Sequence, residues 1–84
     1  MQEYTLKISL LQIEGALIRL LGVIERRGFI LKHVQTVPES EKVWCVTVHV
    51  CGDRSIDVLK RHIERIYDVS GVADGDFGTV FNES

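Results

Sequence analysis

Thiol and imidazole side chains alternate along one segment of this chain, and zinc and other soft metals bind such side chains. Cys45, His49 and Cys51 share one face of an extended backbone, and His33 lies in the preceding segment, which we expect to pair with it. A structural zinc site needs a full set of ligands within about 2.3 Å of the metal, whereas a flat sheet spreads these groups apart. We therefore interpret them as small side chains on a half-exposed sheet face and predict no metal site.

The sequence also lacks the arrangements that nucleophilic catalysis requires. It has no strained Gly-x-Ser-x-Gly turn, and neither cysteine has an evident activating partner. A phosphate cradle of the acylphosphatase type would need an arginine in the first loop, but Leu11–Glu14 offers apolar and acidic groups. The carboxylates are scattered over expected helix surfaces. We predict no catalytic residue and no enzymatic activity of this chain alone.

Composition and charge narrow the classes of partner. The 84 residues suffice for one domain with a modest core, and their formal net charge of −2 argues against nucleic-acid binding. The N-terminus does not resemble a secretory signal, and no apolar run is long enough to cross a membrane. Cys45 and Cys51 are too far apart on one strand for a disulfide. We expect a cytoplasmic protein with neither nucleic acid nor membrane as a partner.

Hydrophobic periodicity predicts two helices. In the stretch Glu14 to Phe29, apolar residues recur at helical spacing, and Gly28 stands where a residue with positive φ would end the helix. Ser55 is a good N-cap for the second helix. The apolar stripe of that second helix is Ile56, Leu59, Ile63, Ile66 and Tyr67.

Four segments have the character of strands. Strict alternation from Tyr4 to Leu10 indicates a half-buried strand, and Val43–Cys51 is the strongest strand of the chain. In Phe29–Val37 the alternation changes parity near Lys32, which is typical of a β-bulge. Glycines interrupt the last strand, Val69–Phe77.

The predicted order is β-α-β-β-α-β, in two similar halves. This order predicts an α+β, ferredoxin-like βαββαβ sandwich, in which a four-stranded sheet carries two helices on one face. The first and third strands, which are the most apolar, should be central, and the second and fourth should be the edges. We expect a single domain over residues 1–77 and a mobile tail over residues 78–84.

Three residues do not suit a simple monomer. Ile18 and Val58 are apolar residues on the polar sides of their helices, and Gly22 lies in the middle of a helix, where glycine costs about 1 kcal/mol. Single exposed apolar residues are ordinary on monomeric proteins. The alternative is that all three belong to a surface covered by a partner. Both interpretations stay open.

The order and spacing of several short motifs resemble the ACT domain family. The first helix opens with Gly-Ala-Leu (Gly15–Leu17) and ends with Arg27-Gly28-Phe29, similar to the opening and ending of the first ACT helix. The run Ile66–Val69 resembles the Leu-Val-Asp-Val run of the small regulatory subunit of acetohydroxyacid synthase (acetolactate synthase). The similarity covers about residues 4–77. Without a C-terminal domain, the chain resembles the short, single-domain form of that subunit.

This resemblance implies a non-catalytic regulatory subunit that binds and activates the large catalytic subunit in branched-chain amino acid biosynthesis. Thiamine diphosphate, Mg²⁺ and FAD are expected on that catalytic partner, and no cofactor is expected in this chain. Two copies would form a homodimer through their second strands, which are edge strands. In feedback-sensitive relatives, a branched-chain amino acid binds where two ACT domains meet, against the first loop and the start of the second strand.

On this sequence, the effector-binding residues implied by the resemblance are Gln12, Ile13, Glu14, Gly15, Ala16 and Ile30. Gly15 matches the loop glycine of the family, whose backbone can approach a ligand carboxylate at the start of the helix. Gln12 replaces the usual Asn or Asp, and Ile30 replaces the usual asparagine. A desolvated amino acid needs several polar partners, and isoleucine removes one of them. We favour the absence of valine or leucine feedback and keep its presence as the alternative.

Two other classes of function stay open. An ACT-type amino-acid-sensing module that acts on another target would take up valine, leucine or isoleucine measurably. A stand-alone interaction module without a ligand would be told apart only by its partner.

Overall fold

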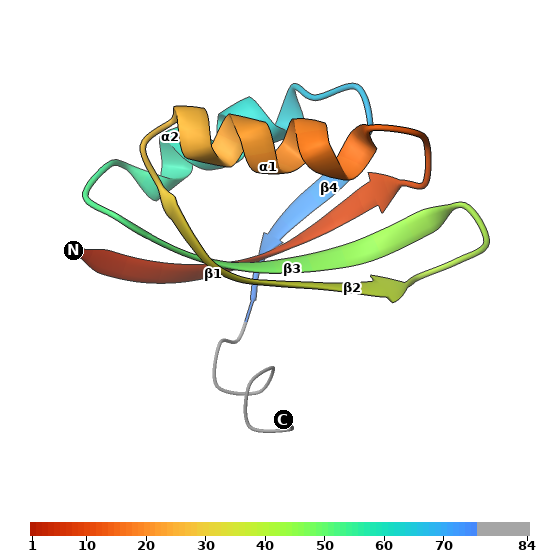
Figure 1. Ribbon diagram of the computed structural model, residues 1–84, viewed down its shortest axis with the longest axis horizontal. Helices are drawn as coiled ribbons and strands as arrows, with labels where there is room; N and C mark the ends of the chain where they lie inside the picture. Colours follow the sequence, from red (N-terminus) through yellow and green to blue (C-terminus); the bar gives the residue numbers. More distant parts are fainter. Residues whose placement is uncertain (76–84) are drawn as a thin grey trace.

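The computed structural model describes residues 1–75, and its elements follow the predicted order. These elements are β1 (Gln2–Leu11), α1 (Ala16–Arg26), β2 (Ile30–Pro38), β3 (Val43–Gly52), α2 (Ile56–Glu64) and β4 (Val69–Asp74). Figure 1 shows both helices over one face of a single four-stranded antiparallel sheet. The predicted α+β, ferredoxin-like βαββαβ fold is confirmed.

The strands lie in the order β2-β3-β1-β4, so β1 and β3 are central, as predicted, and β2 and β4 are the edges. The pairing register of β2 against β3 shifts between Leu31 and His33, which confirms the predicted bulge near Lys32. Because of this shift, Ile30 lies opposite Cys51 and Val37 lies opposite Cys45, so both point to the sheet face turned away from the helices.

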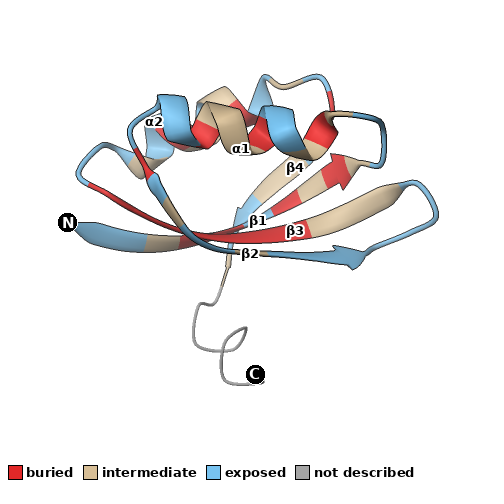
Figure 2. Ribbon diagram, in the orientation of Figure 1, coloured by how far each residue is buried: buried red, intermediate tan, exposed pale blue. Residues whose placement is uncertain are grey.

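The core lies between the sheet and the helices, where Figure 2 shows the buried parts of the central strands and of the helix undersides. Alternation along β1 and β3 turns every second side chain toward the helices. The core residues with no exposed surface in these strands and α1 are Leu6, Ile8, Leu10, Ala16, Leu20, Ile24, Val46, Val48 and Val50. From α2, Leu59 and Ile63 complete the core.

The helix ends follow the predicted chemistry, with one correction. Gly28 has a φ of 89° directly after α1, and the Ser55 Oγ accepts a hydrogen bond from the Val58 N–H at 3.4 Å at the start of α2. The expected apolar stripe of the second helix is wrong at its end, because α2 stops at Glu64. Helical spacing therefore no longer applies to Tyr67, whose 87% exposure places it on the surface.

Within the described residues β4 ends at Asp74, so Gly75 does not continue the predicted strand. The remainder of that predicted strand, the end of the predicted domain at residue 77 and the predicted mobile tail, residues 78–84, lie outside the described residues.

Candidate effector and partner-binding site

The loop between β1 and α1, the first turn of α1 and one side chain of β3 enclose an open pocket of about 460 Å³. Its lining residues are Gln12, Ile13, Glu14, Gly15, Leu17, Ile18 and Trp44. Four of the six predicted effector residues, Gln12 to Gly15, are therefore brought together. Their carboxylate and amide groups lie next to apolar side chains, which is the combination that an amino acid with an apolar side chain requires.

The other two predicted effector residues lie elsewhere. Ala16 has no exposed surface and belongs to the core below the loop. Ile30 begins β2 opposite Cys51, whereas the pocket lies beside Trp44 at the other end of β3. Consequently, one copy of the chain does not bring Ile30 to the pocket.

Backbone hydrogen bonds fix the loop at the pocket floor. The Gln12 N–H donates to the Lys42 carbonyl at 2.9 Å, which connects the loop to the turn between β2 and β3. The Ala16 N–H donates to the Ile13 carbonyl at 3.1 Å. No side chain caps α1, so the N–H groups of Leu17 and Ile18 begin the helix without a capping acceptor beside the pocket. These two donors are suited to a carboxylate.

Gly15 has a specific steric role in this loop. Its φ of 79° lies in the left-handed region, and a Cβ added to it would lie 2.8 Å from the Nη1 of Arg19. The Arg19 Nη2 donates to the Glu14 carbonyl at 3.2 Å. Glycine is therefore favoured here, because it adopts the left-handed φ without strain and leaves room for the end of the Arg19 side chain.

Arg19 also binds the segment between α2 and β4. Its Nε donates to the Asp68 Oδ2 at 2.7 Å, and the Asp68 side chain is only 3% exposed. The backbone of Asp68 adds a second connection, because its carbonyl accepts from the Leu11 N–H at 2.8 Å. Arg19 thus connects Gly15, in the Gly-Ala-Leu motif, to Asp68, in the run Ile66–Val69.

Sequence reasoning missed this connection. Arg19 and Asp68 are 49 residues apart, and helical spacing alone places Arg19 among the solvent-facing residues of α1. One sequence signal could have indicated the contact of Arg19 with the loop: Arg19 lies four residues after Gly15, and residues at this spacing share one side of a helix.

The three predicted partner-interface residues lie on the outer side of the helix layer, in two places. Ile18 is 77% exposed, and Gly22 follows one turn later on the same side of α1. A Cβ at Gly22 would meet only the flexible Arg26 side chain, at 3.3 Å, so the backbone there is open to a close approach. Val58 is exposed near the start of α2, in a different pocket.

The thiol and imidazole groups are more buried than expected. His49 and Cys51 are only 4% and 7% exposed, so the interpretation of a half-exposed face is wrong at these positions. Neighbouring strands flank β3 on both sides, and Glu3 lies against His49 with Oε1 2.8 Å from Nε2. Among residues 1–75, no three potential ligands are grouped closely enough to hold a metal ion.

A family model described as the ACT domain matches residues 12–72. The chain belongs to the ACT domain family. The match includes the pocket loop, Arg19 and Asp68, and ACT domains are regulatory modules rather than catalytic ones. None of the described helices is long and apolar enough to cross a membrane.

Solved structures agree with this ACT fold. The acetolactate synthase small subunit from Thermotoga maritima is 18% identical, with a TM-score of 0.80. That alignment covers 92% of this chain and 49% of the other, so this ACT domain spans about half of that subunit. The ACT domain of GTP pyrophosphokinase from Chlorobium tepidum is 11% identical, with a TM-score of 0.73, over 87% of this chain and 96% of that one. A search of curated protein sequences found no match.

Proposed function

We propose that this ACT domain is the small regulatory subunit of acetohydroxyacid synthase, binding and activating the large catalytic subunit in the cytoplasm. The observation that carries the proposal is the ion pair between Arg19 and the buried Asp68, at 2.7 Å. Asp68 belongs to the run that resembles the Leu-Val-Asp-Val run of that subunit, and Arg19 follows the Gly-Ala-Leu opening. The two motifs of the resemblance therefore act as one structural unit beside the pocket.

The proposed subunit is a homodimer formed through β2. This strand is an edge of the sheet, and the exposed apolar residues Ile30 and Val37 lie on its face turned away from the helices. Antiparallel pairing of two β2 strands would give each edge a partner and extend the sheet across both copies. Such an interface, with the helices beside it, should bury at least about 1,000 Å² in total.

This dimer would bring β2 of the second copy to the end of the sheet that carries the pocket. If the pairing is centred on Val34, the start of β2 in one copy lies beside the end of β2 in the other. Within one copy, Pro38 pairs with Trp44, and Trp44 lines the pocket. Ile30 of the second copy would then lie near this end of the sheet, with its side chain on the face opposite Trp44, so it would offer no polar group to a ligand in the pocket. Because a desolvated amino acid needs several polar partners and Ile30 supplies none, we propose that valine and leucine feedback is absent.

The catalytic partner would supply all the chemistry, with thiamine diphosphate, Mg²⁺ and FAD bound to it. The test is to mix the purified chain with a large acetohydroxyacid synthase subunit, then to measure co-elution and the rate of acetolactate formation. We expect a stable complex and a higher rate. A chain that stays monomeric at high concentration and leaves the rate unchanged would contradict the proposal.

A second function, an amino-acid sensor that acts on another target, is favoured by one feature of the pocket. The uncapped N–H groups of Leu17 and Ile18 and the carboxylate of Glu14 could bind the two charged ends of an amino acid. Calorimetry with valine, leucine and isoleucine separates the two functions. Uptake of one of them by the chain without any catalytic subunit would favour the sensor.

A further inference from the structure

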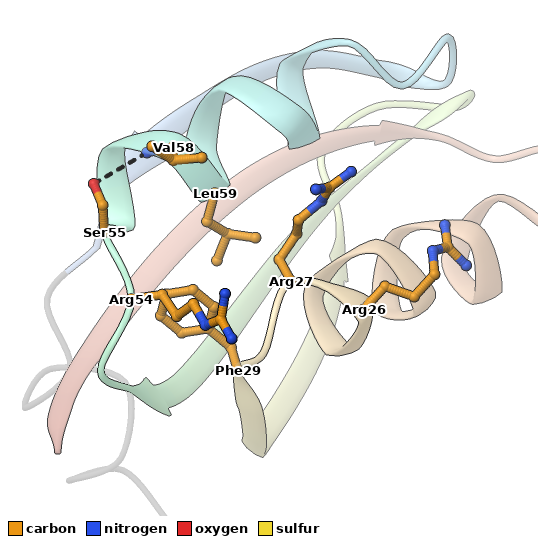
Figure 3. Close-up of a pocket in the computed structure, with 7 residues that line it drawn as sticks. All are labelled: Arg26, Arg27, Phe29, Arg54, Ser55, Val58 and Leu59. Carbon is orange, nitrogen blue, oxygen red and sulfur yellow. Dashed lines mark hydrogen bonds between the residues drawn. The ribbon is translucent and has the colours of Figure 1, made fainter.

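A second pocket, of about 290 Å³, lies at the opposite end of α1, between the end of that helix and the start of α2 (Figure 3). It shares no lining residue with the pocket at the β1–α1 loop. Its lining residues are Arg26, Arg27, Phe29, Arg54, Ser55, Val58 and Leu59. Three arginines and no carboxylate line it, although the whole chain has a net charge of −2.

The arginines of this pocket are not neutralised within the described chain. Each ion pair found in residues 1–75 involves other cations, so Arg26, Arg27 and Arg54 have no carboxylate at ion-pair distance there. Guanidinium groups hold phosphate through two parallel N–H donors, which makes arginine the preferred residue for binding phosphate groups. The unpaired cluster is therefore suited to an anion.

Backbone geometry holds Arg54 at the pocket. A Cβ added to Gly28 would lie 3.1 Å from the Arg54 Nε and 3.5 Å from its Cδ, so the side chain lies directly against the glycine. In Figure 3, Arg54 is drawn in front of the Phe29 ring, and Arg27 is drawn to the right of Leu59. Arg26 instead extends back along α1, with its Nη1 3.3 Å from the Cβ position of Gly22.

The floor of the pocket is apolar, whereas the start of α2 at its side is polar. Phe29 and Leu59 are buried, and Val58 forms an exposed edge. The Ser55 Oγ accepts the Val58 N–H, which leaves its hydroxyl hydrogen available as a donor. Arg27 also acts on His62 of α2, whose pKa is lowered by burial and by the charges of Arg27, Arg65 and Arg61.

We propose that this pocket binds the phosphate group of a small molecule through Arg27 and Arg54, with the rest of the molecule against Phe29 and Leu59. This site is separate from the effector pocket and does not depend on the proposed regulatory function. A bare phosphate ion would use the arginines alone, whereas a larger ligand would also use the apolar floor.

The test is an NMR titration of the full chain with inorganic phosphate and with phenyl phosphate at constant ionic strength. We expect saturable shifts at Arg27, Phe29, Arg54 and Ser55, with tighter binding of phenyl phosphate. The pKa of His62 should rise when phosphate binds, because the anion offsets the charge of Arg27. Equal affinity for both probes would overturn the role of the apolar floor.

Arg54→Gln should weaken binding about tenfold or more, because it removes a charge-assisted donor pair. Arg54→Lys keeps the charge without the planar donor pair and should give an intermediate affinity. The control is Lys42→Gln, which removes the same charge in the turn between β2 and β3. Equal weakening by Lys42→Gln and Arg54→Gln would indicate only general attraction and overturn the site, as would the absence of shifts at its residues.

Discussion

Asp68→Ala tests whether the connection between the two ACT motifs stabilises the fold. The substitution removes a carboxylate that is 3% exposed and lies 2.7 Å from the Arg19 Nε. A hydrogen bond to a charged group contributes about 1.5–3 kcal/mol, and breaking a fully buried ion pair costs about 3–5 kcal/mol. The Arg19 side chain is 51% exposed, so water can solvate the guanidinium after the substitution. We therefore expect a loss of about 2 kcal/mol in the free energy of unfolding.

A loss of about 2 kcal/mol changes the folding equilibrium roughly thirtyfold and lowers the Tm of a domain of this size by roughly 10 °C. Urea unfolding followed by circular dichroism measures it. The matched control is Asp57→Ala, which removes an exposed carboxylate 3.8 Å from Lys60 and should cost only a few tenths of a kcal/mol.

A double-mutant cycle with Arg19→Ala isolates the pair itself. We expect a coupling energy of about 1–2 kcal/mol, because each single substitution already removes the interaction. If Asp68→Ala costs no more than Asp57→Ala, or if the coupling energy is near zero, then the pair does not stabilise the fold and our structural reading of the motifs is wrong.

Three further predictions use single substitutions. Gly15→Ala should destabilise the fold by about 1–2 kcal/mol in the same urea unfolding assay, because φ is 79° and the methyl group would displace Arg19. Gly71→Ala, where the added methyl group has open space around it, is the control. Gly22→Ala should stabilise the chain by about 0.5–1 kcal/mol but weaken co-elution with a catalytic subunit, and unchanged co-elution would exclude Gly22 from the interface. Burial and three neighbouring arginines lower the pKa of His62 in the folded chain, so the unfolded chain takes up the proton first as the pH falls. Thermal melts should therefore show a loss of stability between about pH 7.5 and 5.5 that is smaller in His62→Gln, and equal losses would contradict this.

The fold could be predicted from the sequence because its signals are local. Alternation in Tyr4–Leu10 and Val43–Cys51 marks the central strands, and the parity change near Lys32 marks the bulge. Gly28 and Ser55 mark the ends of helices through their own backbone and side-chain chemistry. Each of these features needs only neighbouring residues to be recognised.

Apart from the end of α2, the errors and omissions arise where distant segments meet. The pair of Arg19 and Asp68 spans 49 residues, and the burial of His49 depends on the strands beside it. Ile30 was assigned to the same site as Gln12 through the resemblance, although one copy of the chain places the two at opposite ends of the sheet. No local pattern contains such distances, so tertiary structure was required.

The two ends of α1 follow one structural rule and differ in one respect. At each end a glycine adopts a left-handed φ, 79° at Gly15 and 89° at Gly28, and an arginine lies where the Cβ would be. At Gly15, Asp68 neutralises the arginine, which makes the contact a structural one. At Gly28, Arg54 has no such carboxylate within residues 1–75 and faces a pocket. Because both glycines adopt a similar left-handed φ, the difference in charge compensation is what leaves Arg54, unlike Arg19, available to a ligand.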